Sequence, residues 1–182
     1  MPTKDLMHAK KNATVIITKN EIDDALLRLA KQLNTDYHDK NPIFLVVLNG
    51  GLIFSGQLLP KIEVLCQLDY CHATRYRGNI HGADIQWKSK PQMDLSQRHI
   101  IIVDDILDEG HTLQAISEYC FANHAKSVKS LILVEKKHQR KAYDNQKPDY
   151  CELTVPDECV FGFGMDYAHH WRNSNVIYSL ND

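Results

Sequence analysis

Residues 100–113 constrain the fold of this chain more than any other stretch. Four consecutive apolar residues, 100–103, run directly into two adjacent carboxylates, Asp104 and Asp105. An unbroken β-branched run indicates a strand that is buried on both faces of a parallel sheet. Beyond Asp108, apolar residues recur at the spacing of a helix face, at Leu113, Ile116 and Cys120. We therefore predict a strand, an acidic loop and a helix, and open α/β sheets bind their ligands at such a loop.

The acidic loop can provide hydrogen-bond donors for an anion and, next to them, oxygen ligands for a cation. Backbone N–H groups are unpaired at a helix start, where the helix dipole is positive, so residues 109–112 can hold a phosphate. Gly110 permits close backbone approach, and Thr112 adds a hydroxyl donor. Asp104 and Asp105 supply hard oxygens that suit Mg²⁺ shared with substrate oxygens. The alternative, two acids that only close a strand and face water, leaves their coincidence with the phosphate turn unexplained.

The same stretch resembles the phosphoribosyl-pyrophosphate signature of the type I phosphoribosyltransferases. That signature is four apolar residues, two acids, two apolar residues, Asp, a small residue, Gly and Thr. Other segments narrow the resemblance to the hypoxanthine-guanine phosphoribosyltransferases, over roughly residues 14–180. It implies one α/β domain, residues 1–182, with a central parallel sheet flanked by helices. It also implies a small hood, built from the N-terminal segment and about residues 150–182, and a mobile loop at about residues 73–98.

Composition excludes several other classes of protein. The 182 residues carry 21 basic and 23 acidic side chains, a net charge of −2, whereas a dedicated nucleic-acid binder usually has a basic excess. No apolar stretch approaches the length of a membrane span, and the first residues do not resemble a signal peptide. Five cysteines without C-x-x-C spacing indicate neither a disulfide scaffold nor a zinc site. We expect a cytoplasmic protein with no nucleic-acid or membrane partner.

Apolar runs elsewhere predict the rest of the sheet. Residues 42–48 and 130–134 are expected to form buried strands, residues 64–71 and 85–87 further strands, and residues 175–180 a final antiparallel or peripheral strand. One helix is expected to begin at Asn20 and to bury Ile22, Leu26, Leu29 and Leu33. A second is expected over residues 52–59, ending at Pro60. Apolar strands alternating with helices indicate a parallel α/β sheet.

The resemblance assigns roles at the central loop. Asp104 and Asp105 would face the ribose diol and its Mg²⁺, and Asp108 would accept a proton from the purine as it attacks. The 5′-phosphate would be held by the turn Glu109, Gly110, His111 and Thr112, and Asp108 would also lie against the phosphoribosyl group. Two residues depart from the family: Glu109 stands where Thr or Ser is usual, and His111 occupies a variable position. Glu109 can be accommodated if its carboxylate points away from the phosphate.

Pyrophosphate contacts are implied on both sides of the central loop. Asn49 and Gly50 follow residues 42–48 and would offer main-chain donors, although Asn-Gly-Gly is also an ordinary tight turn. The family often has a basic residue at the place of Asn49, together with a cis peptide. Arg172 would meet the pyrophosphate, and Asp166 would help to hold a second Mg²⁺ near the purine. Arg75 and Tyr76 correspond to the family's mobile loop, which closes over the reacting centre and excludes water.

The purine contacts are implied by two later segments. Lys136 stands at the place of the lysine that contacts the 6-oxygen, with Lys137 as the alternative if the alignment slips by one residue. Val160 would read the base edge through its backbone, and Cys159 replaces an aromatic residue that stacks on the purine. Either stacking is weaker here, or another ring takes it over, from Phe161, Phe163 or Trp171.

The implied activity is Mg²⁺-dependent transfer of ribose 5-phosphate from phosphoribosyl pyrophosphate to hypoxanthine or guanine, in a homodimer or homotetramer. Two other classes stay open at this point. A phosphoribosyltransferase-like fold can serve as an RNA-binding regulator, which the near-neutral charge disfavours. A phosphoacceptor signalling domain also ends a strand in acids, but it does not need the turn that contains Gly110 and Thr112.

Overall fold

A six-stranded sheet forms the centre of the protein in the computed structural model, which describes residues 3–75, 85–143 and 146–180. Its strand order is β4-β3-β2-β5-β6-β7. The strands are β2 (Ile43–Val47), β3 (Gln67–Arg75), β4 (Ile85–Ser89), β5 (His99–Leu107), β6 (Ser127–Lys136) and β7 (Leu153–Val155). All neighbours pair in parallel except β3 and β4, which are antiparallel. The predicted α/β fold with a central parallel sheet is therefore confirmed.

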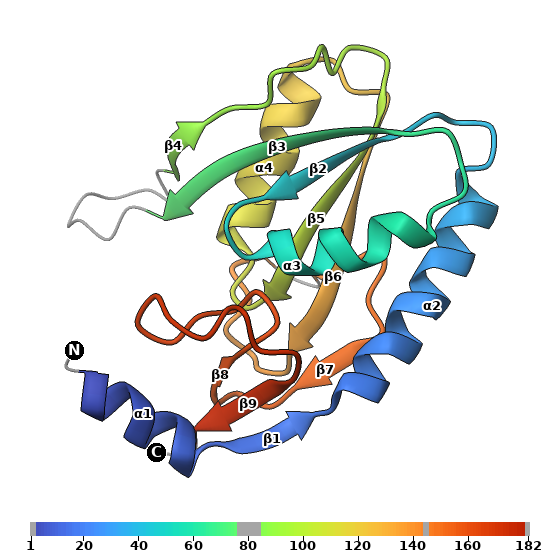
Figure 1. The fold of residues 1–182 in the computed structure, drawn as a ribbon. Helices are drawn as coiled ribbons and strands as arrows, with labels where there is room; N and C mark the ends of the chain where they lie inside the picture. The colour runs from blue at the N-terminus through green and yellow to red at the C-terminus, as the bar shows by residue number, and fades with distance from the viewer. Residues whose placement is uncertain (1–2, 76–84, 144–145, 181–182) are drawn as a thin grey trace.

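Helices cover both faces of this sheet (Figure 1). Helices α2 (Lys19–Asp36) and α3 (Gly51–Leu58) lie on one face, and α4 (His111–Ala122) lies on the other. Alternate residues of a strand point to opposite faces. In β5, Ile101 and Val103 accordingly join the cluster with α2 and α3, whereas Ile100 and Ile102 join the cluster with α4. Burial of both faces explains the unbroken apolar run at residues 100–103 of β5.

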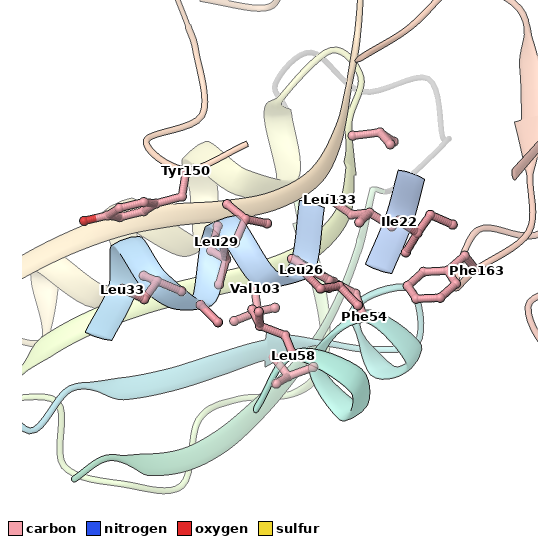
Figure 2. Close-up of a cluster of buried hydrophobic side chains, with 14 of the residues drawn as sticks. Ile22, Leu26, Leu29, Leu33, Phe54, Leu58, Val103, Leu133, Tyr150 and Phe163 are labelled. Carbon is pink, nitrogen blue, oxygen red and sulfur yellow. The ribbon is translucent and has the colours of Figure 1, made fainter. Parts of the chain in front are cut away.

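The core between α2, α3 and the sheet anchors the carboxyl end of β5 (Figure 2). Leu26 and Leu29 of α2 and Phe54 of α3 are 0% exposed and belong to one cluster with Val103 and Leu133. Each such side chain contributes about 1.5–3 kcal/mol by leaving water. The acidic residues that follow Val103 therefore belong to a strand that this core holds firmly in place.

The start of α2 differs from the prediction by two residues. Thr18, not Asn20, is the N-cap: its hydroxyl accepts from the amide of Glu21, and the Glu21 carboxylate accepts from the amide of Thr18. This reciprocal capping box pairs two amides that the first turn leaves open. Its four predicted apolar residues, Ile22, Leu26, Leu29 and Leu33, are all buried.

A small antiparallel sheet stands beside the carboxyl edge of the large one. It has the order β1-β9-β8, with β1 (Thr14–Ile17), β8 (Cys159–Phe161) and β9 (Ile177–Leu180), and α1 (Thr3–Asn12) precedes β1. Thr14 and Val160 both pair with Ser179, so residues from the two ends of the chain share one sheet. The prediction of a final antiparallel strand is confirmed.

A further predicted boundary was wrong. β5 extends to Leu107, so Asp104 and Asp105 lie within the strand and not in a loop. Pairing with β6 continues to Leu107, which keeps this segment extended. The helix predicted to stop at Pro60 does so within one residue: α3 ends at Leu58, and a separate 3-10 turn, η1 (Leu59–Lys61), contains the proline.

The segment predicted as a mobile loop, residues 73–98, is strand in part. Its first three residues end β3, and the predicted short strand at Ile85 is confirmed as β4, antiparallel to β3. Arg75 is the last residue of β3, and Tyr76 lies outside the described residues. Within the described ranges, no helix has the length and apolar character needed to cross a membrane.

Candidate functional site

A cavity of about 690 Å³ opens at the carboxyl edge of the six-stranded sheet. Its wall is formed by the turn after β2, the end of β5 with the start of α4, the end of β6, and the segment after β8. It brings together most of the residues singled out in the sequence: Asn49, Gly50, Asp104, Asp105, Asp108, Glu109, Gly110, His111, Thr112, Lys136, Val160, Asp166 and Arg172. Cys159, which is exposed, is not part of this wall. The volume suits a small-molecule ligand.

Two carboxylates form the floor of the cavity. Asp105 is only 7% exposed, and its amide donates to Asp104 Oδ1 at 3.0 Å. Burial raises the pKa of Asp104, the neighbouring Asp105 carboxylate raises it further, and the Arg172 guanidinium acts in the opposite direction. Burial also raises the pKa of Asp105. At both carboxylates, the effect of burial thus outweighs that of the Arg172 positive charge.

The donor set at this floor fits a hard divalent cation. Two carboxylates supply oxygen ligands, and their raised pKa values show that a cation would relieve the unfavourable burial of charge. Among the described residues, no three His, Cys, Asp or Glu side chains gather closely enough to hold a metal ion. A cation here would therefore take its other ligands from the substrate and from water, the usual arrangement for Mg²⁺.

The turn between β2 and α3 packs closely against the acid pair, Asp104 and Asp105. The peptide between Leu48 and Asn49 is cis, as the resemblance implied. A Cβ on Gly50 would lie 2.3 Å from Asp105 Oδ2, and a Cβ on Gly164 would lie 2.3 Å from the Gly50 carbonyl oxygen. Only glycine fits at these two contacts, which bring the turn close to the carboxylates.

The start of α4 has the form of an anion site. Gly110 is the N-cap with φ +91°, a left-handed conformation that favours glycine, and no side chain caps the helix. The first turn of α4 therefore keeps amides that no side chain caps, and His111 and Thr112 of this turn line the cavity. Gln146 closes the outer side by donating from Nε2 to the Gly110 carbonyl at 3.1 Å. Residues 109–112 thus retain the geometry expected of a phosphate turn.

Glu109 and His111, the two residues of this turn that depart from the family, lie next to each other. His111 Nε2 is 3.7 Å from Glu109 Oε2. Nδ1 of His111 is buried and has no hydrogen-bond partner among the described residues. Glu109 is also one of the residues that line the cavity.

Asp108 is held between two cationic or donor groups at the end of β6. Lys136 Nζ lies 3.1 Å from Asp108 Oδ2, and His138 Nε2 lies 2.6 Å from Oδ1. Burial alone would raise the pKa of Asp108, but the hydrogen bonds from Lys136 and His138 outweigh it, and the pKa falls below its usual value. Lys137 is exposed and pairs with Glu135, so the geometry favours Lys136 over the alternative lysine.

Sequence reasoning missed His138 and Lys141. The Lys141 ammonium donates to three carbonyl oxygens, those of Leu107 at 3.0 Å, Asp108 at 2.7 Å and Lys136 at 3.2 Å. It therefore ties the end of β5 to the end of β6. Both residues lie in a run of basic side chains that resembles an ordinary solvated segment, and no spacing in the sequence distinguishes them.

The segment after β8 closes the opposite wall. Arg172 forms an ion pair with Asp166 and donates from Nη1 to the Gly164 carbonyl at 2.6 Å. The other Asp166 oxygen accepts from the His169 amide at 2.8 Å. His169 and His170 are exposed, and His169 also lines the cavity. The positive charge of Arg172 partly offsets the burial that raises the pKa values of Asp104 and Asp105.

Known proteins resemble this chain over nearly its whole length. Residues 16–168 match the family described as phosphoribosyl transferase domain. The chain is 32% identical over 169 residues to the hypoxanthine-guanine phosphoribosyltransferase of Streptococcus pneumoniae, covering 92% of this chain and 93% of that protein. Identity to the Bacillus subtilis enzyme of the same name is 34% over 165 residues, 90% of each chain.

Solved structures agree with these relatives. A crystal structure of a hypoxanthine phosphoribosyltransferase from Staphylococcus aureus superposes with a TM-score of 0.88 at 26% identity, covering 99% of this chain and 97% of that chain. The family match, the curated relatives and this fold all point to the same group. The chain therefore belongs to the hypoxanthine-guanine phosphoribosyltransferases, pentosyl-transferring enzymes of purine salvage within the phosphoribosyltransferase family.

Proposed function

We propose that the protein transfers ribose 5-phosphate from Mg²⁺-bound phosphoribosyl pyrophosphate to N9 of hypoxanthine or guanine, giving IMP or GMP and pyrophosphate. One observation carries the proposal: a single cavity joins a buried acid pair, a helix N-terminus and the Lys136–Asp108 ion pair of 3.1 Å. These three parts match a sugar diol, a 5′-phosphate and an oxo-purine.

Asp104 and Asp105 would hold the sugar. Their carboxylate oxygens accept from the two ribose hydroxyls and supply ligands for Mg²⁺, with Asp166 as the candidate ligand of a second ion. When bound, Mg²⁺ supplies positive charge to the pyrophosphate leaving group. Asn49, Gly50 and Arg172 line the same cavity and would offer main-chain donors and a guanidinium to the pyrophosphate.

Asp108 would handle the proton. N9 of the purine attacks C1′ of the ribose, and the C1′–O bond breaks so that pyrophosphate leaves with the electron pair. The N7 proton passes to the Asp108 carboxylate, which is ionised at neutral pH because Lys136 and His138 keep its pKa low. Proton transfer of this kind contributes about 10²- to 10⁴-fold to the rate.

Lys136 would select the base. Its ammonium is a donor only, so it matches the 6-oxo group of hypoxanthine and guanine and opposes the 6-amino group of adenine. The side chain is 12% exposed, and a mismatched donor there would stay largely out of water. Val160 also lines the cavity and offers its backbone to the base edge.

The test is nucleotide formation from each base. Purified protein is incubated with phosphoribosyl pyrophosphate, Mg²⁺ and hypoxanthine, guanine or adenine, and products are separated by chromatography. IMP and GMP should form and AMP should hardly form. Lys136→Met should lose the oxo-purines, whereas the neighbouring exposed lysine, in Lys137→Met, provides a matched control that keeps them. AMP at a rate comparable to IMP would overturn the assignment of Lys136, and the absence of any nucleotide would overturn the proposed function.

A further inference from the structure

His138 lies behind Asp108, on the side away from the cavity. Its side chain is 3% exposed and does not contribute to the cavity wall, whereas the Asp108 side chain is 43% exposed. The 2.6 Å contact joins His138 Nε2 to Asp108 Oδ1, and Lys136 approaches the other oxygen, Oδ2. His138 therefore touches the carboxylate without reaching the space that a substrate would fill.

The hydrogen bonds of His138 fix which ring nitrogen carries the proton. Nδ1 accepts from the Arg140 amide at 2.9 Å, so Nδ1 must present a lone pair. The ring proton then lies on Nε2, which donates to Asp108. A main-chain amide, a buried ring and a carboxylate form one chain of hydrogen bonds in which each donor and acceptor is determined.

We propose that His138 is a positioning residue for the proton acceptor: its Nε2–H holds Asp108 Oδ1 in place and stabilises the carboxylate when Lys136 turns from Oδ2 to the purine oxygen. This inference rests on the role proposed above for Asp108. An incoming oxo-purine draws the Lys136 ammonium toward its 6-oxygen and leaves Oδ2 open to the N7 proton. His138 is then the donor that remains on the carboxylate, and the buried ring keeps Oδ2 aimed into the cavity.

Other charges around Asp108 do not replace this contact. Lys141 donates to the Asp108 carbonyl and not to its carboxylate. Arg140 is committed to an ion pair with Asp157 through both guanidinium nitrogens. Glu109, the acidic neighbour along the chain, lies with His111. Lys136 and His138 are thus the two donors that face the carboxylate in the described residues, and one of them leaves on substrate binding.

Three variants of the protein separate the effect of losing the His138 hydrogen-bond donor from the effect of changing the packing of its side chain. His138→Leu fills similar space without a donor, and His138→Gln restores an amide donor near the position of Nε2. Gln139→Ala changes the adjacent exposed residue and serves as the matched control. We expect His138→Leu to lower kcat by about 10- to 100-fold, the effect of losing a hydrogen bond to a charged group. The KM for guanine should change little, Gln should recover much of kcat, and the control should match the wild type.

The pH dependence of kcat/KM is a further measurement, and a change in packing alone should not shift it. Losing a donor to the carboxylate favours its protonated form, so the acidic limb of kcat/KM should shift to higher pH in His138→Leu and return in His138→Gln. Equal kcat loss in both variants, or an unmoved acidic limb, would overturn the proposal.

A measurement without turnover keeps the inference testable by itself. The ¹⁵N shifts of the histidine rings, with His138 assigned by its absence in the Leu variant, should show a protonated Nε2 and an unprotonated Nδ1. A protonated Nδ1 would contradict the hydrogen-bond chain. If the wild type forms no nucleotide, the proposed function fails, while the ring tautomer still decides whether His138 donates to Asp108.

Discussion

Replacing Gly50 by Ala tests whether the turn after β2 sets the position of the acid pair. Gly50 has φ −60° and ψ −50°, a conformation that alanine adopts readily, so any defect must come from space and not from backbone strain. The added Cβ would lie 2.3, 2.5 and 2.6 Å from Oδ2, Cγ and Oδ1 of Asp105. To restore an ordinary contact of 3.4 Å, the carboxylate or the turn must move by about 1 Å.

Neither side of this contact has room to move. Asp105 is 7% exposed in the middle of the sheet, and Gly164 presses on the Gly50 carbonyl from the other side. A displacement of about 1 Å at a reacting centre typically costs about 100-fold in rate. We therefore expect Gly50→Ala to lower kcat/KM for phosphoribosyl pyrophosphate by about 100-fold. Overpacking of this kind should also cost about 1–3 kcal/mol of folding stability.

Gly56→Ala is the matched control for this experiment. Gly56 lies within the same helix, α3, and a Cβ there meets nothing within 4 Å. Alanine in a helix interior is favoured over glycine by up to about 1 kcal/mol, so this variant should be slightly more stable and fully active. Initial rates of IMP formation at varied phosphoribosyl pyrophosphate, with urea melts of each variant, make the comparison. Wild-type kcat/KM in Gly50→Ala would refute the steric argument.

Three further changes test separate parts of the molecule. Asp108→Asn should lower kcat far more than it raises KM, because a proton acceptor acts chiefly in the transition state; steady-state kinetics with guanine decide, and near-normal turnover would exclude the role. Asp149 should stabilise the fold only above acidic pH: burial opposes ionisation, but hydrogen bonds from Lys129 and Ser130 lower its pKa overall. That stabilisation is complete above the unfolded pKa of about 3.9 and is lost as the pH falls through the folded pKa, so Asp149→Asn should be less stable at pH 7 and show a flatter decline in acid melts. Cys159→Phe should lower the KM for guanine severalfold with kcat nearly unchanged, since stacking is similar in ground and transition states, whereas a raised KM would mean that the added ring clashes with the base.

The buried strands were predictable because their environment determines their composition. β2, β5 and β6 lie inside the sheet and are covered on both faces, so each contains a continuous apolar run. Their carboxyl ends meet at one edge, which is why Asp104 and Lys136 could be assigned to the same site. The exact end of β5 was not predictable, because the acids stay in the strand through pairing with β6, a contact that no local signal encodes.

The residues that hold the site in place from the segment after β6 depend on the path that this segment takes. His138 and Lys141 reach the end of β5 only because the segment after β6 folds back across it. In the sequence they belong to a basic run that a solvated loop would equally show. The burial of the His138 ring and the three hydrogen bonds of Lys141 result from the path of the segment after β6, and amino-acid composition does not specify that path.

The three rings suggested as substitutes for a stacking residue have other partners. Phe161 is 0% exposed and stacks on Tyr178, with ring centroids 5.2 Å apart at 16°. Phe163 is 1% exposed and belongs to the core with α2 and α3 (Figure 2). Trp171 lies under the Lys10 ammonium, 4.2 Å from the ring centroid. Among the described residues that line the cavity, none of these rings appears, so the suggestion of a substitute ring gains no support.

The remaining apolar wall is aliphatic. Ile106 and Met165 line the cavity on either side of the region that contains Lys136 and Val160, and Cys159 stands exposed just before Val160. A base stacked on an aromatic ring gains about 1–3 kcal/mol, whereas a thioether or branched side chain offers less specific contact with its π-face. For the proposed reaction, we therefore expect selectivity among bases to depend more on the hydrogen bonds at the base edge than on stacking. Because a hydrogen-bonding site rejects a mismatched group strongly while a stacking surface accepts any base, weak stacking leaves the Lys136 preference for oxo-purines intact.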